Sequence, residues 1–198
     1  MMSYKCTLLR TLLRTLLPIT TAIAMLTSSI VYADIALDND QSTVSFVSIK
    51  KGTAGEAHTF KKVSGLLSDS GELKIVIDLA SVDTKVEIRD TRMKRDLFET
   101  SKFAEATLTA KVDAMTEDGV KNISTDATLD LHGVSKTVLV HATVVKNGDS
   151  IVATSTKPII IDAAAFGLDG GIAKLKELAK LPSIATAVPV NFVLVFSK

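Results

Sequence analysis

The segment from Thr128 to Val140 constrains the fold more strongly than any other part of the chain. Apolar and polar residues alternate on both sides of a short interruption at Gly133, a pattern that predicts two antiparallel strands joined by a tight turn. The alternation separates an apolar from a polar face, with Ala127, Leu129 and Leu131 on the first and Thr128, Asp130 and His132 on the second. Because one hairpin is not stable alone in water, the rest of the chain must supply further strands.

Alternation with a period of two recurs in five more segments, which begin at Val44, Leu73, Leu108, Ile151 and Val188. Three turn signals follow one another at Gly119, Gly133 and Gly148, 14 and 15 residues apart. This spacing leaves strands of about ten residues, whereas short-strand sandwiches turn about every 8 to 12 residues. The pattern therefore predicts an all-β chain that forms an up-and-down barrel.

Residues 1–33 have the composition of an export signal. Three basic residues and no acidic residue lie before a mostly apolar stretch at 16–26, and small residues at positions 31 and 33 form a cleavage pattern. An uncleaved membrane anchor is the alternative, but Pro18 and several hydroxyl residues interrupt the run of about 18 apolar residues that a span needs. We predict a cleaved signal peptide at 1–33 and one exported domain at 34–198.

Removal of the signal changes the composition of the chain. The remainder has 20 Lys and Arg against 22 Asp and Glu, a near-neutral balance that provides no basic surface for nucleic acid. Cys6, the only cysteine, leaves with the signal, so the exported protein has neither a disulfide nor a reactive thiol. Its 165 residues suit one domain that is large enough to bury a core.

Two stretches depart from the strand pattern. Between 91 and 102, apolar residues recur at helical spacing among charged ones, which predicts a short helix or an irregular crossing. Between 172 and 181, apolar and charged residues occupy opposite faces of an amphipathic helix that Pro182 ends. This second helix is too short to be stable alone, so it either packs against the barrel or covers a cavity as a lid.

Several motifs together resemble the signature of one family. They are Ala80 to Thr84, the pair Arg89 and Asp90, Asp96 to Phe98, Leu129 to Lys136, and the pair Phe166 and Gly167. In order and spacing they resemble the YceI-like family over roughly residues 40–196, and the blocks at 81–84 and 129–136 are the most specific.

The resemblance implies an eight-stranded antiparallel barrel like that of a lipocalin, exported to the bacterial periplasm. It also implies an elongated apolar interior that holds an isoprenoid chain, such as a polyprenyl phosphate or a quinone. With the two helical stretches, the expected fold is an eight-stranded lipocalin-like barrel with one or two short helices. The chain departs from the family pattern in having Lys50 and Lys51 where many members carry a histidine, in lacking the usual proline before Leu108, and in the 172–181 helix, which resembles an insertion. These departures lie where one end of a ligand would be contacted.

The inward side chains decide whether such a barrel is filled or hollow. The chain has no Trp, and many expected inward positions are Ala, Val, Thr or Ser, which leaves room for a slender ligand. The candidate apolar ligand contacts are Phe46, Phe60, Phe98, Phe103, Phe166 and Phe192. Each of them also suits an ordinary core position, because apolar side chains at strand period must be buried.

Arg89 and Arg92 are the candidate contacts for a polar head group, because guanidinium groups suit phosphate oxygens. Lys94 and Arg95 continue this basic stretch, but two aspartates alternate with it, so a self-neutralised surface is the alternative. His132, beside the turn glycine, is either a ligand contact or a structural hydrogen-bonding residue.

The sequence predicts no enzyme, no metal site and no required cofactor. It has no nucleophile elbow, no phosphate-binding glycine loop and no zinc spacing, and His58 and His141 add nothing to such a site. We expect a binding or carrier protein for an isoprenoid or other long-chain amphiphile, in transient contact with the inner membrane. The alternative is a ligand-free, filled barrel that serves the stress response or binds a protein partner. An exposed strand edge would allow a homodimer, but no sequence feature requires one.

Overall fold

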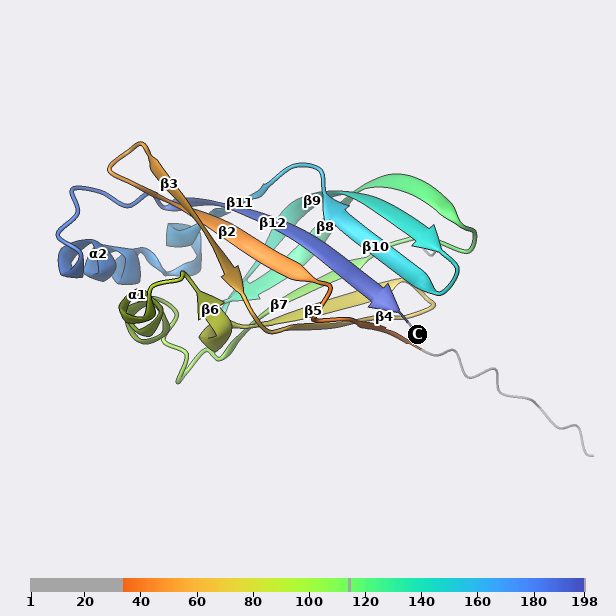
Figure 1. The fold of residues 1–198 in the computed structure, drawn as a ribbon, viewed down its shortest axis with the longest axis horizontal. Helices are drawn as coiled ribbons and strands as arrows, with labels where there is room; N and C mark the ends of the chain where they lie inside the picture. Colours follow the sequence, from red (N-terminus) through yellow and green to blue (C-terminus); the bar gives the residue numbers. More distant parts are fainter. Residues whose placement is uncertain (1–33, 114, 198) are drawn as a thin grey trace, which may run out of the picture. The chain divides into compact units, whose positions relative to one another are not determined.

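The computed structural model describes residues 34–113 and 115–197, and the predicted signal peptide lies outside the described residues. Strands dominate this part of the chain (Figure 1). They are β1 (Ile35–Leu37), β2 (Thr43–Lys50), β3 (Ala54–Phe60), β4 (Val63–Leu67), β5 (Glu72–Asp78), β6 (Val82–Asp83), β7 (Glu105–Lys111), β8 (Gly119–Leu131), β9 (Val134–Asn147), β10 (Ser150–Ser155), β11 (Ile159–Asp162) and β12 (Ala187–Ser197).

The strands close into a ring. Hydrogen-bonded neighbours follow the order β1, β4, β5, β7, β8, β9, β10 and β12, and β12 pairs with β1 where Leu37 lies opposite Phe196. Further along the barrel, three other strands take over from members of this ring: β2 continues β1, β3 continues β4, and β11 continues β10. There β12 pairs with both β2 and β11, and β2 pairs with β3. The described chain is thus a closed eight-stranded antiparallel barrel, which confirms the predicted fold class.

The predicted central hairpin is formed by β8 and β9. Their ladder runs from Gly119 opposite Lys146 to Leu131 opposite Val134. Between the strands, His132 and Gly133 have φ angles of 54° and 79°, so both turn residues are left-handed. A two-residue turn of this kind matches the twist of the strands that it joins.

An irregular crossing connects β5 to β7. It contains a short 3-10 turn η1 (Leu79–Ser81), strand β6, helix α1 (Glu87–Arg92) and a π-helical turn η2 (Met93–Leu97). The helix therefore begins earlier than the predicted 91–102, and the N–H of Phe98 donates to the carbonyl of Met93 at 2.8 Å. Met93, Leu97 and Phe98, the apolar residues that recur at helical spacing here, are all buried in this turn.

Helix α2 (Asp169–Leu178) follows the 3-10 turn η3 (Ala163–Phe166) and precedes β12. It begins before the predicted 172–181, so Gly170 and Gly171 lie inside its first turn. At Gly171, an added Cβ would lie 2.7 Å from the carbonyl oxygen of Asp96, and the missing side chain lets α2 pack closely on η2. None of the helices in the described ranges is long and apolar enough to cross a membrane.

The helices and the tip of the β2–β3 hairpin gather at one end of the barrel, which we call the helical end (Figure 1). The hairpin tip is tied to the segment after α2, because the N–H of Lys51 donates to the carbonyl of Ser183 at 3.1 Å and that of Ala185 to the carbonyl of Ile49 at 2.9 Å. The β4–β5 and β9–β10 turns lie at the opposite end, which we call the apolar end for its lining (Figure 1).

Candidate functional site

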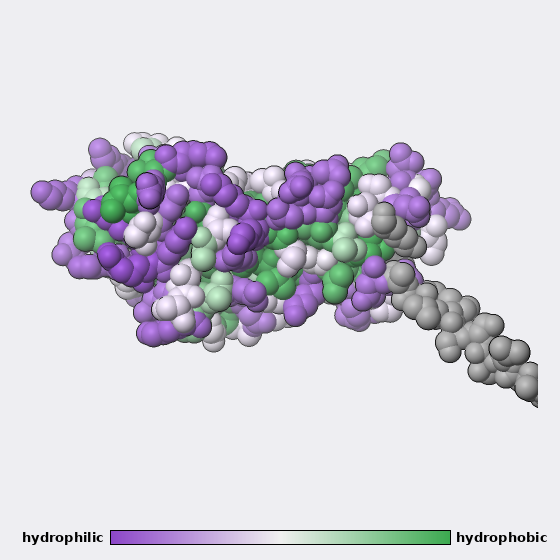
Figure 2. Space-filling model, turned by 60° about the horizontal axis from the view of Figure 1, so that its bottom comes forward, coloured by the Kyte–Doolittle hydropathy of each residue, from purple (hydrophilic) through white to green (hydrophobic). Residues whose placement is uncertain are grey.

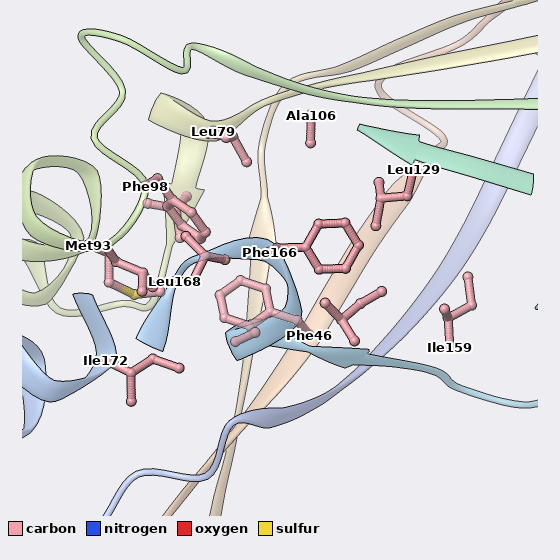
Figure 3. Close-up of a cluster of buried hydrophobic side chains, with 14 of the residues drawn as sticks. Phe46, Leu79, Met93, Phe98, Ala106, Leu129, Ile159, Phe166, Leu168 and Ile172 are labelled. Atoms are coloured by element: carbon pink, nitrogen blue, oxygen red, sulfur yellow. The ribbon is translucent and has the colours of Figure 1, made fainter. Parts of the chain in front are cut away.

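The barrel encloses a cavity of about 610 Å³, lined mainly by apolar side chains on the inner faces of its strands. Figure 3 shows Phe46, Phe98 and Leu129 converging on this interior from different elements. Small side chains at inward positions leave the space open, among them Ala106, Ala110, Ala127, Ala142 and Ala153. The interior is therefore hollow, which is what a slender apolar ligand requires.

At the apolar end, the cavity is lined by hydrophobic side chains from several strands. Val44, Ile75, Leu194 and Phe196 line it and belong to one buried cluster. Phe196 is only 2% exposed, although it lies close to the end of β12. An aliphatic chain lying here would replace water next to apolar walls, and that exchange favours binding.

At the helical end, three charged side chains form a compact group beside the cavity. Lys50 Nζ on β2 lies 2.6 Å from Glu56 Oε2 on β3, and Arg89 of α1 pairs with the same oxygen. The hydrogen bond from Lys50 and the charge of Arg89 hold the pKa of Glu56 below its usual range. Glu56 is thus ionised at neutral pH, and this trio carries a net positive charge.

His58 lies next to this trio on the inner face of β3 and is only 3% exposed. Its Nε2 is 2.9 Å from Ser48 Oγ, and its ring meets Phe46 edge to face at 5.3 Å. Burial lowers the pKa of His58, and the charges of Arg89 and Lys50 lower it further. The imidazole is therefore neutral at neutral pH, and its Nδ1 has no hydrogen-bond partner within the described residues.

The helices border the opening of the cavity at this end. Ile172 and Leu175 of α2 line it, and so do Val86 and Ile88 next to and within α1. Val86 and Ile88 are nevertheless 39% and 57% exposed, so they face both the cavity and the solvent. Figure 2 shows apolar side chains among hydrophilic ones at this end of the barrel.

Comparison with known proteins places this barrel in a family. The family model described as YceI-like domain matches residues 36–196. The chain belongs to the YceI-like family. No curated protein matches it.

Solved structures of this YceI-like fold come from several bacteria. A polyisoprenoid-binding domain from Saccharophagus degradans, implicated in plant cell wall breakdown, is 38% identical with a TM-score of 0.79, covering 82% of this chain and 97% of that chain. BcnA from Burkholderia cenocepacia is 25% identical with a TM-score of 0.64, covering 80% of this chain and 98% of that one. A YCEI protein from Campylobacter jejuni is 22% identical with a TM-score of 0.52, covering 71% and 84%, and shares the fold.

The structure brings together most of the side chains that the sequence singled out. The predicted contacts that line the cavity of this YceI-like barrel are Phe46, Phe60, Phe98, Phe192, Arg89 and Arg92. Phe60 packs against both Phe46 and Phe98, with ring centroids 5.3 and 5.9 Å away. That any of these residues contacts a ligand stays a prediction.

The other three predicted contacts lie outside the cavity lining. The rings of Phe103 and His132 lie 4.3 Å apart between centroids and are tilted by 51°, and His132 Nε2 lies 3.3 Å from Glu99 Oε2. Phe166 is a buried core residue of η3 that is 3% exposed. Phe103 packs against the β8–β9 turn, which contains His132, and an added Cβ on Gly133 would meet Phe103 at 3.0 Å.

Sequence reasoning missed the polar half of the site. Ser48, Lys50, Glu56 and His58 all line the cavity, yet only Lys50 was singled out, as a departure from the family pattern. Polar residues at the inward positions of β3 hid its alternation, because an apolar inner face was the signal being sought. The turn signal at Gly52, which follows the period-two segment of β2, could have revealed this hairpin.

The charged groups of the site do not form a metal centre. Within residues 34–113 and 115–197, no group of three or more His, Cys, Asp or Glu side chains could hold a metal ion. The ionic chemistry near the cavity is that of hydrogen bonding and charge pairing.

Proposed function

We propose that the protein binds an isoprenoid-type amphiphile and carries it through the periplasm, with the tail inside the barrel. The observation that carries the proposal is the apolar cavity of about 610 Å³ running from Phe196 to the polar group around Glu56. The similarity to the polyisoprenoid-binding domain from Saccharophagus degradans supports it. A filled barrel that binds only protein partners would need inner side chains that meet across the axis, whereas the alanines leave this interior open.

The energetics favour a tail of repeated apolar units. Each buried CH₂ group contributes about 0.8 kcal/mol, so a tail gains affinity along its length without polar contacts. The polar head of the same molecule belongs at the helical end, near Arg89 and Lys50, since the apolar end offers Val44, Leu194 and Phe196 instead. The proposal includes no catalytic step and no cofactor.

Loading and release take place at the helical end. Val86 and Ile88 offer exposed apolar side chains at the opening, suited to transient contact with the surface of the inner membrane. Helix α2 covers part of the opening through Ile172 and Leu175. The periplasmic location rests on the export signal predicted at 1–33.

A side chain that fills the cavity tests the binding of the tail. In the Ala153→Phe variant a ring occupies the apolar part of the cavity, where it displaces about two or more CH₂ groups and weakens the binding of a polyprenol at least about tenfold. Thr154→Phe is the matched control, because Thr154 is the next residue of β10 and is exposed. Titration of both purified variants with a fluorescent polyprenol measures the effect, and circular dichroism checks their fold. Equal affinities for both variants would contradict the proposal.

A further inference from the structure

The charges on the outside of the barrel are divided unevenly between its two ends. The helical end has ten basic and eight acidic side chains, in the segments 50–56, 83–99 and 169–182. The apolar end has four basic and nine acidic side chains, in the segments 34–40, 69–74, 111–121 and 146–149. The barrel is therefore an electric dipole, positive at the helical end and negative at the other.

The two ends lie far enough apart to act as separate surfaces. Strand β8 has 13 residues, so it alone extends over about 40 Å along its length. The Debye length is only about 8 Å at about 0.15 M salt. The acidic side chains of the apolar end therefore do not cancel the attraction of an anionic surface to the helical end.

Half of the basic side chains at the helical end have no carboxylate partner. Within the described residues, no carboxylate lies within 4 Å of Lys51, Arg92, Lys94, Lys176 or Lys180. Three carboxylates of the same segments are also unpaired there, which leaves a surplus of two positive charges. Lys51 at the tip of the β2–β3 hairpin, Lys176 in α2 and Lys180 after it are all exposed, so this surplus is open to a partner.

Exposed apolar side chains accompany these cations around the opening of the cavity. Val86 and Ile88 border the opening and are 39% and 57% exposed. Ala179 borders the same opening, so Lys180, the next residue, lies beside it. The interface of an anionic bilayer suits such a surface, because its head groups attract cations and its acyl chains accept apolar side chains.

We propose that the helical end docks onto a lipid surface with anionic head groups, while the acidic apolar end points away from that surface. The inference rests on the proposed function, because an amphiphile enters from a lipid surface through this opening. An acidic protein would also attract the lysines. The exposed Val86 and Ile88 at the mouth of an apolar cavity favour lipid, since acyl chains provide a matching apolar medium.

The test measures binding to two kinds of vesicle by sedimentation: phosphatidylcholine alone, and phosphatidylcholine with an equal part of phosphatidylglycerol. Wild-type protein is expected to bind the anionic vesicles at least about tenfold more tightly, and added salt reduces the difference. Lys176→Gln/Lys180→Gln weakens this binding at least about tenfold, since each basic side chain near an anionic surface contributes about fivefold. Lys74→Gln/Lys121→Gln is the matched control, because both lysines are exposed and belong to the apolar end.

The orientation of the docked barrel has a readout of its own, because the chain contains no Trp. Ser183 at the helical end and Asn147 at the end of β9 are both exposed, so a Trp at either position reports on its surroundings. On anionic vesicles, the emission of Ser183→Trp is expected to shift to shorter wavelength, and that of Asn147→Trp is expected to stay unchanged.

Three results would overturn the inference: equal binding of both kinds of vesicle, unchanged binding by the Lys176→Gln/Lys180→Gln variant, or a shift in the emission of Asn147→Trp alone. Binding of polyglutamate without binding of anionic vesicles would overturn it too and assign the surface to an acidic protein. Each of these results leaves the proposed function standing, provided that the wild type still binds the fluorescent polyprenol. Binding of anionic vesicles without binding of polyprenol would instead overturn the proposed function alone.

Discussion

The two ends of the barrel interior differ in chemistry although the same strands build both. Strand β2 contributes Val44 to the apolar end and Lys50 to the helical end, six residues apart on one face. At the apolar end, side chains pack against one another around Phe196. At the helical end, charged side chains pair across β2, β3 and α1, and half-exposed residues border the opening.

This difference implies that the two ends have different roles, one in the stability of the fold and the other in the choice of ligand. Packing at the apolar end closes the ring of strands, because β12 meets β1 where Phe196 lies opposite Leu37. The ion pairs at the helical end involve partly exposed groups, with 43% of the Glu56 side chain accessible, and such pairs contribute little to folding. We therefore expect changes at the first end to alter folding and changes at the second to alter which ligand is bound.

The largest effect is expected from Phe196→Ala at the apolar end. The loss of a buried ring lowers the free energy of unfolding by about 3 to 5 kcal/mol, measured by urea denaturation. Lys50→Met at the other end is the matched comparison and changes that free energy by less than about 1 kcal/mol. A larger loss from Lys50→Met than from Phe196→Ala would break the distinction between the two ends.

Gly171→Ala tests how closely α2 packs at the helical end. An added Cβ would lie 2.7 Å from the carbonyl oxygen of Asp96 and 2.8 Å from Leu97 Cα, so the helix must shift at a cost of about 1 to 3 kcal/mol. Gly170→Ala is the control, because a Cβ there meets nothing within 4 Å, and alanine favours a helix by up to about 1 kcal/mol. The melting temperature should fall in Gly171→Ala and rise in Gly170→Ala. Equal melting temperatures in the two variants would mean that α2 does not depend on this close approach.

A smaller effect is expected in the pH dependence of stability. Burial lowers the pKa of folded His58 from its ordinary 6.5, so the unfolded chain takes up a proton first as the pH falls. Stability from this group is fully present above about pH 6.5 and decreases below it, until the folded protein is protonated as well. His58→Gln should flatten the decrease in melting temperature between about pH 7 and 5. An unchanged slope in His58→Gln would argue against a buried neutral imidazole.

The smallest effect is expected on the outer surface, away from both ends of the cavity lining. Val120 on β8 is 69% exposed, so Val120→Thr should change the free energy of unfolding by less than about 0.5 kcal/mol and leave ligand affinity unaltered. Urea denaturation and polyprenol titration measure the two quantities. A clear loss of either would mean that the outer face of this strand takes part in folding or in binding.

The sequence predicted the parts of the fold in which apolar residues alternate clearly. The strands around Gly133 and the inward face of β12 follow directly from period-two patterns, because burial on one side of a sheet fixes the register. Strand β3 was missed, since Glu56 and His58 point inward where an apolar pattern was expected. Pairing across β2, β3 and α1 depends on the tertiary fold, and local spacing does not encode it.

The residues predicted for the candidate site also fall into two groups, those that line the cavity and those that do not. Phe46 and Phe192 line the cavity from period-two segments and Phe98 lines it from the helical stretch, whereas Phe166 and His132 occupy packing positions outside the lining. Sequence spacing could not separate these groups, because a core position and a cavity wall both require an apolar side chain. Only the closed ring of strands determines which of them border an empty interior.

The central claim is that the interior is a binding site for an isoprenoid amphiphile. Native mass spectrometry on the protein, purified gently from the cells that produce it, tests it most directly, followed by extraction and identification of any bound molecule. The account predicts one isoprenoid amphiphile per barrel, retained in gentle conditions and released on denaturation. An unloaded mass that stays unchanged after incubation with polyprenols, polyprenyl phosphates and quinones would contradict it.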